Sequence, residues 1–322
     1  MSSSSAAAPA AAPSAPEPRP LAHLERAVER LTPLSLAERA WDNVGIMVEA
    51  PTVRTDSKRR IVLCNDLTTQ VCDEALAHPD IFAILAYHPP IFGGLKSITL
   101  ANPLQRSLLR CVASGVSVYA IHTASDSAVG GVNDYMASGL LQAAGVKTDQ
   151  DGMIQPGTGN GSKAITPAKD VPEGQAGAGG GRLVDLLEAS GGRKLARHEA
   201  VQAVKERLNL KHLQAAWSPT GVDEIQTVAI CAGSGAGVLK GVPADLYLTG
   251  EMSHHDILAA TAAGTHVFCC NHSATERPWL SYYAPRLQKA LNAEAQAEKG
   301  AGGEVAYEVV VSTADREPLE VV

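Results

Sequence analysis

Two stretches of this chain carry a histidine followed four residues later by a carboxylate. "IHTASD" places His122 before Asp126, and "NHSATE" places His272 before Glu276. Neutral imidazole and carboxylate together suit Zn²⁺, Fe²⁺, Mn²⁺ or Co²⁺ better than Ca²⁺ or Mg²⁺. The same spacing would also arise where a solvated strand end is followed by a helix cap. Because the spacing occurs twice, we favour a metal site over two unrelated caps.

Four polar residues at predicted strand ends are the candidate metal ligands: His88, Asp126, His272 and Glu276. In open α/β sheets, ligands bind beyond the carboxyl ends of the strands. Two carboxylates could bridge two cations about 3.5–4 Å apart, the geometry used to activate water. A single histidine at a strand end is usually a hydrogen-bonded surface residue, so the prediction depends on the four residues meeting.

Strand-like and helix-like segments alternate along the chain. Continuous runs rich in Val, Ile and Leu are expected strands, and the stretches between them are expected helices. The expected strands are 59–66, 80–88, 116–126, 227–235, 245–251, 266–272 and 305–315. The expected helices are 21–31, 68–78, 103–115, 132–145, 198–210, 255–264 and 275–295. This alternation predicts an α/β fold with largely parallel sheets covered by helices.

The two parts of the chain correspond in sequence. "RRIVLCND" matches "TVAICAGS", "DIFAILAYHPP" matches "ADLYLTGEMSHH", and "VSVYAIHTASD" matches "THVFCCNHSATE". The last match aligns the two histidine–carboxylate pairs. We therefore predict an internal duplication into two similar α/β halves, with the metal site in the cleft between them. The first half would span 21–150 and the second 182–322.

Two segments fall outside these halves. Residues 1–20 are an Ala/Pro/Ser tract without the basic start and apolar core of a signal peptide, and we expect a disordered tail. Residues 151–181 are rich in Gly and Pro and are predicted to be a flexible insert. Ordering such a segment costs about 1–2 kcal/mol per residue with little burial in return, so it should be dispensable for folding.

Three further polar residues lie at or just after the end of the expected strand at 245–251. Glu251, His254 and His255 could line the cleft as acid/base or phosphate-contacting groups. For the two histidines, a helix turn that faces the solvent is an equal alternative. In the first half, Asp42 closes a turn and could reach the cleft.

A glycine-rich loop, "GSGAG" (233–237), lies at the end of the expected strand at 227–235. Gly233, Gly235 and Gly237 could bring backbone amides close to a phosphate, as loops in this position often do. The spacing is not GxGxxG, and the P-loop lysine is missing. We interpret it as a tight loop at the rim of the cleft that could contact phosphate.

Composition limits the class of protein. The chain has 322 residues, of which 45% are apolar and 4% aromatic, so Ala, Val and Leu must form the core. A net charge of -7 without a Lys/Arg run argues against nucleic-acid binding. The six cysteines lie mostly in apolar runs without a CxxC pair, as expected for reduced core residues. No apolar run approaches the roughly 20 residues of a membrane span. We predict a cytoplasmic location, with the nucleus as an alternative.

Five separated motifs resemble one known family. They are "WDNVGIMVE" (41–49), "AYHPPIF" (86–92), "HTASDSAVGGVND" (122–134), "YLTGEMSHHD" (247–256) and "NHSATERPWL" (271–280). In this order they are similar to the YbgI-like dinuclear metal-centre family, the NGG-interacting-factor homologues often labelled GTP cyclohydrolase I type 2 homologues. The resemblance implies two similar α/β halves, a metal pair between them and a ring-like homo-oligomer, a hexamer in bacteria.

Carried over to this chain, the resemblance gives the same four ligands as above. Many bacterial members have a His-His pair where this sequence has Tyr87-His88. A tyrosine is a poorer ligand because its phenol must lose a proton with a pKa near 10, about the value of the free side chain. The resemblance thus implies one tight and one weaker metal ion, with Tyr87 and His122 beside the metal or facing the substrate.

Two functions remain open. The first is a metal-dependent, cyclohydrolase-like hydrolase acting on a nucleotide or another small phosphorylated or cyclic compound. The second is a non-enzymatic metal-bearing scaffold or regulatory partner of another protein, as the name of the resembling family implies. In either case we expect a homo-oligomer, from dimer to hexamer, and no membrane partner.

Overall fold

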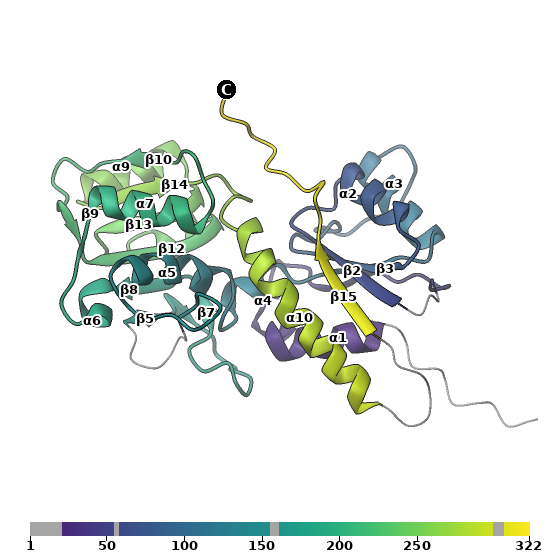
Figure 1. Cartoon of the computed structure of the whole chain (residues 1–322). Coiled ribbons are helices and arrows are strands. Elements are labelled where there is room, and N and C mark those ends of the chain that lie inside the picture. The colour runs from purple at the N-terminus through teal and green to yellow at the C-terminus, as the bar shows by residue number, and fades with distance from the viewer. Residues whose placement is uncertain (1–20, 55–57, 155–160, 299–305) are drawn as a thin grey trace, which may run out of the picture.

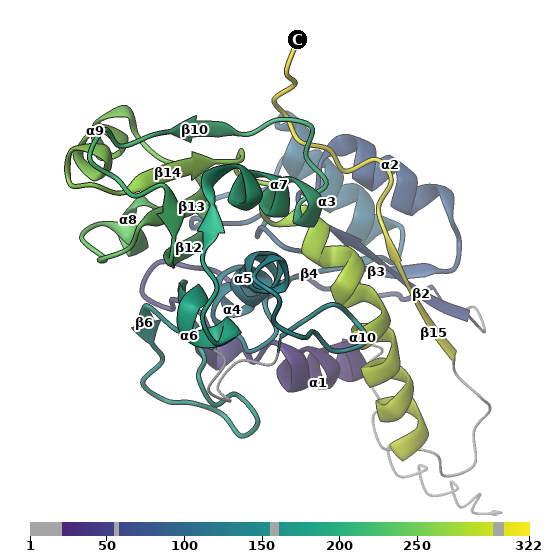
Figure 2. The ribbon, with the colours of Figure 1, turned by 60° about the vertical axis from the view of Figure 1, so that its left-hand side comes forward.

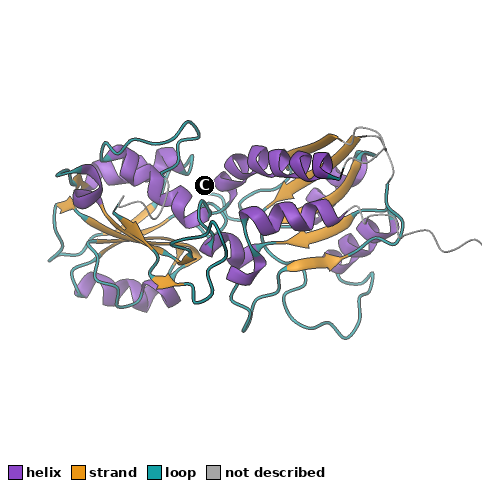
Figure 3. Cartoon of the chain, turned by 90° about the horizontal axis from the view of Figure 1, so that it is seen from below, coloured by secondary structure: helices purple, strands orange, loops and turns teal. Residues whose placement is uncertain are grey.

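Two sheets form two lobes that stand side by side (Figures 1 and 3). The computed structural model describes residues 21–54, 58–154, 161–298 and 306–322. The expected disordered tail, 1–20, lies outside these residues. Each lobe has the mixed α/β architecture predicted from the alternating segments, with helices on both faces of its sheet (Figure 3).

The first lobe is built on a five-stranded sheet. Its strands, in spatial order, are β1 (Gly45–Val48), β4 (Ser117–Ala120), β3 (Ile81–Ala86), β2 (Lys58–Cys64) and β15 (Ala306–Val311). All neighbouring pairs are parallel except β1 and β4, which are antiparallel. Every residue of β3 and β4 is buried, as expected for continuous apolar strands in a parallel sheet.

Helices cover both faces of this sheet because successive strand residues point to opposite sides. The covering helices are α1 (Leu21–Leu31), α2 (Thr69–Ala77), α3 (Pro103–Ala113) and α10 (Arg277–Ala297). Ile61 and Leu63 pack in one cluster with α1 and α10. Their neighbours Val62 and Cys64 pack on the opposite side with α2 and α3.

The second lobe is built on a six-stranded sheet of mixed direction. Its strands, in spatial order, are β10 (Gln214–Ala216), β14 (His266–Cys269), β13 (Leu246–Glu251), β12 (Thr227–Ser234), β8 (Arg182–Asp185) and β5 (Ser162–Lys163). Only β14, β13 and β12 are parallel; the other three pairings are antiparallel. The largely parallel sheet expected here is therefore limited to three strands, because the added strands are too short to show a clear apolar run.

Five helices accompany the second sheet: α5 (Val132–Ala143), α6 (Leu186–Ser190), α7 (Arg197–Arg207), α8 (Ala236–Leu239) and α9 (His254–Ala262). α5 packs against β12 and α7 on one face, and α8 and α9 cover the other. The remaining short elements are η1 (Leu34–Leu36), α4 (His122–Ser127), the pair β6 (Thr166–Pro167) and β7 (Gly179–Gly180), and the pair β9 (Leu195–Ala196) and β11 (Glu224–Ile225). Within the described residues, no helix combines the length and the apolar composition that crossing a membrane requires.

The lobes do not coincide with the halves predicted at 21–150 and 182–322. The closing strand β15 pairs with β2 along its whole length, and α10 packs on α1, so both belong to the first lobe (Figure 2). α5, expected in the first half, belongs to the second lobe. An apolar strand pattern predicts a buried strand but does not identify its partner. The chain thus crosses between the lobes twice, at residues 121–131 and 270–276, which we call the crossing segments.

Four strands of each sheet share one arrangement. The order β1-β4-β3-β2 repeats as β10-β14-β13-β12, and in both sets the first strand is antiparallel to three parallel ones. The internal duplication stays a prediction, and this shared order supports it.

The expected insert, 151–181, is in part built into the fold. β5 joins the edge of the second sheet, and Ala178 is buried in a cluster with Leu36 and Ala128. The buried side chain of Gln175 accepts a hydrogen bond from the amide of Val129 at 2.8 Å. Of this segment, 155–160 lie outside the described residues. The rest contacts the first crossing segment and differs from the free linker that its composition indicated.

A buried arginine explains why this glycine-rich segment is ordered. Arg182 donates to the carbonyls of Gly179 and Gly181 at 2.7 Å each, and it pairs with the buried carboxylate of Asp134. Gly179 and Gly181 both have positive φ, 148° and 62°. These glycines therefore allow a turn that points two carbonyls at one guanidinium, and they do not indicate flexibility.

Candidate metal centre

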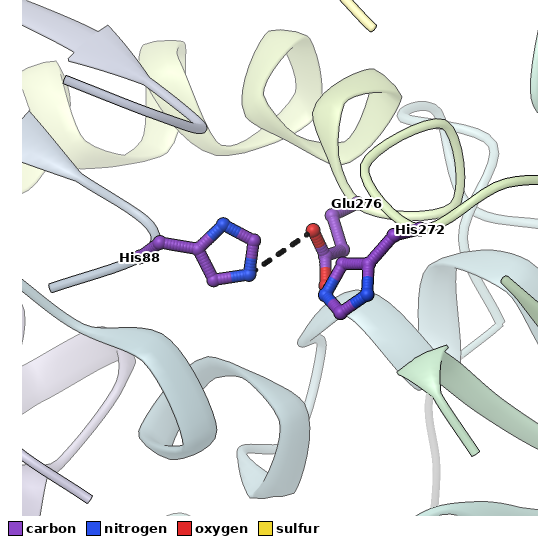
Figure 4. A group of neighbouring side chains, drawn as sticks. All are labelled: His88, His272 and Glu276. Atoms are coloured by element: carbon purple, nitrogen blue, oxygen red, sulfur yellow. Dashed lines mark ion pairs between the residues drawn. The ribbon is translucent and has the colours of Figure 1, made fainter. Parts of the chain in front are cut away.

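Three of the four predicted ligands converge at the junction of the lobes. The possible ligand atoms of His88, His272 and Glu276 all lie within 4.8 Å of one another. Glu276 lies between the two rings: its Oε2 is 3.5 Å from His88 Nε2, and its Oε1 is 3.3 Å from His272 Nε2 (Figure 4). The two imidazole centroids are 5.2 Å apart.

Each of the three side chains is placed by the end of a buried strand or the start of a helix. His88 follows β3, where its amide donates to the carbonyl of Asn65 at 2.9 Å. His272 follows β14 after Asn271, which adopts φ 66°, a left-handed conformation that asparagine tolerates. Glu276 directly precedes α10.

Glu276 occupies the N-cap position of α10, but its side chain makes no capping hydrogen bond. Its carboxylate is buried and contacts the two imidazoles. The alternative of a helix cap therefore does not describe this residue. α10 begins at Arg277, two residues later than the sequence indicated, because Thr275 and Glu276 close a turn whose amides bond to the carbonyls of His272 and Ser273.

Both histidines are oriented by a second carboxylate. His88 Nδ1 lies 3.0 Å from Asp66 Oδ1, and His272 Nδ1 lies 2.9 Å from Glu251 Oε1. Each Nε2 is thereby directed at Glu276. A carboxylate on the far nitrogen is the usual arrangement around a metal-binding histidine, because it fixes the ring and makes it a stronger base.

The three groups stabilise opposite charges on one another. Burial alone would raise the pKa of Glu276, but His272 and His88 hold that pKa at about 2. Burial alone would lower the pKa of His88, yet Asp66 and Glu276 raise it to about 10. Glu276 is also the main cause that raises the pKa of His272 to about 9. An anionic carboxylate between two basic imidazoles is a donor set that fits a divalent transition metal.

The end of β12 approaches this group closely at Gly233. A Cβ there would lie 2.7 Å from Glu276 Oε1 and 3.0 Å from His272 Nε2, so a larger residue would displace the carboxylate. Gly235 instead packs on Thr249, and a Cβ at Gly237 would meet no atom within 4 Å. Of the three glycines predicted to form a phosphate loop, one therefore lies against the metal group.

Asp126 lies near the three converging residues but outside their group. Its carboxylate accepts a hydrogen bond from the hydroxyl of Tyr87, and its backbone carbonyl accepts one from Asn133 at 3.0 Å. Burial, with the nearby charge of Glu276, raises the pKa of Asp126 to about 6 although Tyr87 acts in the opposite direction. His122 and Asp126 have the same spacing as His272 and Glu276, but only the second pair belongs to the three-residue metal group.

His122 belongs to a separate pair. Its Nδ1 lies 2.6 Å from Oδ1 of Asp42, and its ring centroid is 5.2 Å from that of His88. The backbone φ of His122 is 20°, at the point where β4 gives way to α4. Asp42, whose reach into the cleft was left open, thus orients a histidine beside the centre. His122 is placed beside the expected metal and not within the three-residue group.

The polar residues at and just after the end of β13 take different positions in the structure. Glu251 contacts His272, as described above. His254 and His255 are exposed in the first turn of α9, and neither belongs to the metal group or lines the cavity beside it. The solvent-facing alternative describes these two histidines.

Asn65 and Asp66 were not among the predicted site residues. They follow β2, and the side-chain amide of Asn65 donates to Glu276 Oε2 at 3.0 Å while Asp66 holds His88. "CND" ends an apolar strand at the position that "AGS" occupies in the matching part of the chain. That correspondence could have identified them, but polar residues at a strand end are also common in ordinary turns.

A cavity of about 280 Å³ adjoins the centre. It is bordered by both crossing segments and by the second sheet, and its lining includes Trp41, His122, Asp126, Gly233, His272 and Glu276. The arrangement can therefore hold a cation at one end of a cavity that accepts a small molecule.

Known proteins match this chain over nearly its whole length. The family model Duf34/NIF3 (NGG1p interacting factor 3) matches residues 21–300. The protein NIF3 homolog of Schizosaccharomyces pombe is 38% identical over 298 residues, which cover 92% of this chain and 96% of that protein. NGG1-interacting factor 3 of Saccharomyces cerevisiae is 32% identical over 312 residues, covering 92% of this chain and 96% of that protein.

Solved structures share the fold at lower identity. A hypothetical protein of Staphylococcus aureus has a TM-score of 0.69 at 21% identity, covering 95% of this chain and 100% of that one. A Bacillus cereus protein related to NIF3 has a TM-score of 0.66 at 19% identity, covering 92% and 97%. Protein ybgI, of unknown function, has a TM-score of 0.59 at 19% identity, covering 90% and 96%. The chain therefore belongs to the DUF34/NIF3 family, as the five sequence motifs had indicated.

Proposed function

We propose that this protein is a metal-dependent hydrolase whose cation is held by His88, His272 and Glu276. The observation that carries the proposal is the convergence of these three ligand atoms within 4.8 Å, with a carboxylate behind each imidazole. Two imidazoles and one carboxylate favour Zn, Fe, Mn or Co among divalent metals. A bound cation of this kind supplies a Lewis acid that brings the pKa of a coordinated water to near neutrality, about 7.

The residues of the chain would bind and orient the substrate. Trp41 is exposed at the cavity, and its ring lies 6.0 Å from the rings of both Phe92 and His122. Such an aromatic surface suits a flat heterocycle, because ring faces stack through dispersion and their quadrupoles. This supports a nucleotide or another small phosphorylated or cyclic compound as the substrate class.

We further propose a second, weaker metal position at Asp126. It would share Glu276, which faces the same cavity. The hydroxyl of Tyr87 already occupies one oxygen of the Asp126 carboxylate, and burial with nearby carboxylates holds the pKa of Tyr87 well above its usual range. A phenol that keeps its proton is a poor ligand, so we expect one tight ion and partial occupancy of the second position.

The test is a metal titration of protein freed of metal, followed by a nucleotide hydrolysis screen. Glu276→Gln keeps the size of the side chain and removes its charge, and we expect metal affinity to fall by about 100-fold or more because a direct ligand is lost. His254→Gln, which changes an exposed histidine outside the group, is the matched control. Equal metal affinity in wild type and Glu276→Gln would reject the centre.

A non-enzymatic role is the second candidate. The name of the yeast relative, NGG1-interacting factor 3, describes a protein that interacts with another protein. A metal-loaded protein that turns over no nucleotide but is stabilised by a protein partner would favour this role. A turnover that needs metal and is lost in Glu276→Gln would favour the hydrolase.

Self-association and location are also proposals. We expect a homo-oligomer between dimer and hexamer, which is tested below. The expected location, in the cytoplasm or alternatively the nucleus, stays a prediction.

A further inference from the structure

A second cavity, of about 770 Å³, shares no lining residue with the cavity beside the metal centre. It is bordered by α10, the end of α1, α5 and the end of α7; α1 and α5 both lie beside α10 in Figure 2. Its size is that of sites for small organic ligands, about 300–1,000 Å³.

The charge of its lining is opposite to that of the protein. Four cationic side chains border it: Arg30, Arg207, Arg286 and Lys289. Among the described lining residues, Asp151 is the single carboxylate. The whole chain, by contrast, has 34 acidic and 27 Lys or Arg residues. A concave, locally positive site in an acidic protein attracts anions.

Arg207 is held in place without a carboxylate partner. Its guanidinium carbon lies 3.7 Å from the centroid of Tyr135, and its Nε donates to the carbonyl of Tyr135 at 2.7 Å. Gly139 leaves space for the arginine stem, because a Cβ there would lie 2.7 Å from Arg207 Cβ. Arg207 is partly buried and forms no ion pair with any residue that the structure describes. Its positive charge is thus oriented without being held in an ion pair to a described residue.

Arg286 and Lys289 lie almost one turn apart on α10. The guanidinium of Arg286 lies over the ring of Tyr282 at 5.0 Å, and that ring is 6.2 Å from the ring of Tyr135. Neither cation has a hydrogen bond or ion pair to a described residue. Like charges at this helical spacing repel each other, and a bound anion would relieve the repulsion. Arg30, in contrast, is paired with Glu294 and is not counted as a free cation.

We infer that this cavity binds a small phosphorylated compound, whose phosphate groups are held by Arg207, Arg286 and Lys289. A guanidinium offers two parallel N–H donors to a phosphate, and an ammonium adds a point charge. Three cations around one concave site, none in an ion pair with a described residue, match a polyphosphate better than a single carboxylate. The site takes Arg207 from the second lobe and the other two cations from the first lobe.

The test is calorimetric titration of metal-free protein with inorganic tripolyphosphate at physiological ionic strength. We expect Arg286→Gln with Lys289→Gln to weaken binding by about tenfold or more, because two charge-assisted contacts are removed. The control is Lys211→Gln with Arg316→Gln, which removes the same charge at two exposed positions outside the cavity. Its affinity should match the wild type.

Three results would overturn the inference. The first is a wild type that binds no tripolyphosphate, and the second is an equal loss of affinity for it in both double variants. The third result is loss of tripolyphosphate binding in Glu276→Gln but not in the double variant of Arg286 and Lys289. The last would place the phosphate at the metal centre. Since both double variants leave the metal ligands intact, their metal content separates failure of this site from failure of the proposed hydrolase.

Discussion

The imidazole of His88 is held between two carboxylates, Asp66 on Nδ1 and Glu276 near Nε2. Changing Asp66→Ala should therefore weaken metal binding by about 10–100-fold, although Asp66 is not itself placed as a ligand. Asp73→Ala, which removes an exposed carboxylate paired with Arg110, should leave metal affinity unchanged. The comparison is a metal titration of each variant. If both variants bind metal like the wild type, Asp66 does not orient His88.

Protons compete with the metal for the two histidines. The pKa values of His88 and His272 are raised to about 10 and about 9. Both rings are therefore imidazolium ions, protonated on both nitrogens, at neutral pH before a metal binds. Glu276, with a pKa of about 2, is already ionised. Metal binding must release the ring protons, so affinity should rise with pH, by up to about two log units per pH unit below these pKa values. Titrations at several pH values in buffers of different ionisation enthalpy would measure the release. An affinity independent of pH would contradict this account.

The sequence could predict His88, His272 and Glu276 because each combines a ligand type with the end of an apolar run. It could not separate Asp126 from them, because the direction of that side chain depends on the turn at His122 and on the hydroxyl of Tyr87. Asp66 gave no distinct signal, since an aspartate after a strand is typical of ordinary turns.

At the scale of elements, the segment before β8 is expected to stabilise the fold. Replacing residues 162–180 by a short Gly/Ser linker removes the buried Gln175 and Ala178 and one carbonyl acceptor of Arg182. We expect the free energy of unfolding to fall by about 3 kcal/mol or more, because a buried guanidinium loses one acceptor and the buried contacts of Gln175 and Ala178 are lost as well. Urea denaturation measures the change, and Lys169→Ala, at an exposed position of the same segment, is the control. An unchanged midpoint in the replacement would restore the view of a free linker.

Local patterns predicted the central strands of both sheets well but not their assembly. β2, β3 and β4, like β12, β13 and β14, each contain a short apolar run of the kind that is typical of a buried strand. β15 is an equally clear strand, yet it pairs with β2 from more than 240 residues earlier in the sequence. Such pairing depends on which sheet edge is open, and that is a property of the completed lobe.

At the scale of the whole molecule, one exposed apolar segment supports self-association. Residues 92–104 expose five large apolar side chains: Phe92, Leu95, Ile98, Leu100 and Leu104. Exposed apolar side chains that cluster on a protein surface commonly indicate a site of contact with another protein. We expect light scattering to find an oligomer, between dimer and hexamer, that Leu95→Asp with Leu100→Asp shifts toward monomer. Leu319→Asp, at an exposed position near the C-terminal end, is the control. A wild type that is monomeric at micromolar concentration would contradict the prediction.

The two crossings of the chain between the lobes also determine an order of events during synthesis. The second sheet and α5 to α9 come from one continuous stretch, so this lobe can fold as soon as that stretch has left the ribosome. The first lobe must wait, because α10 and β15 are made after the whole of the second lobe. Until then the edge of β2 is unpaired and the apolar face that α10 covers is open to water, which makes the nascent first lobe a natural substrate for chaperones.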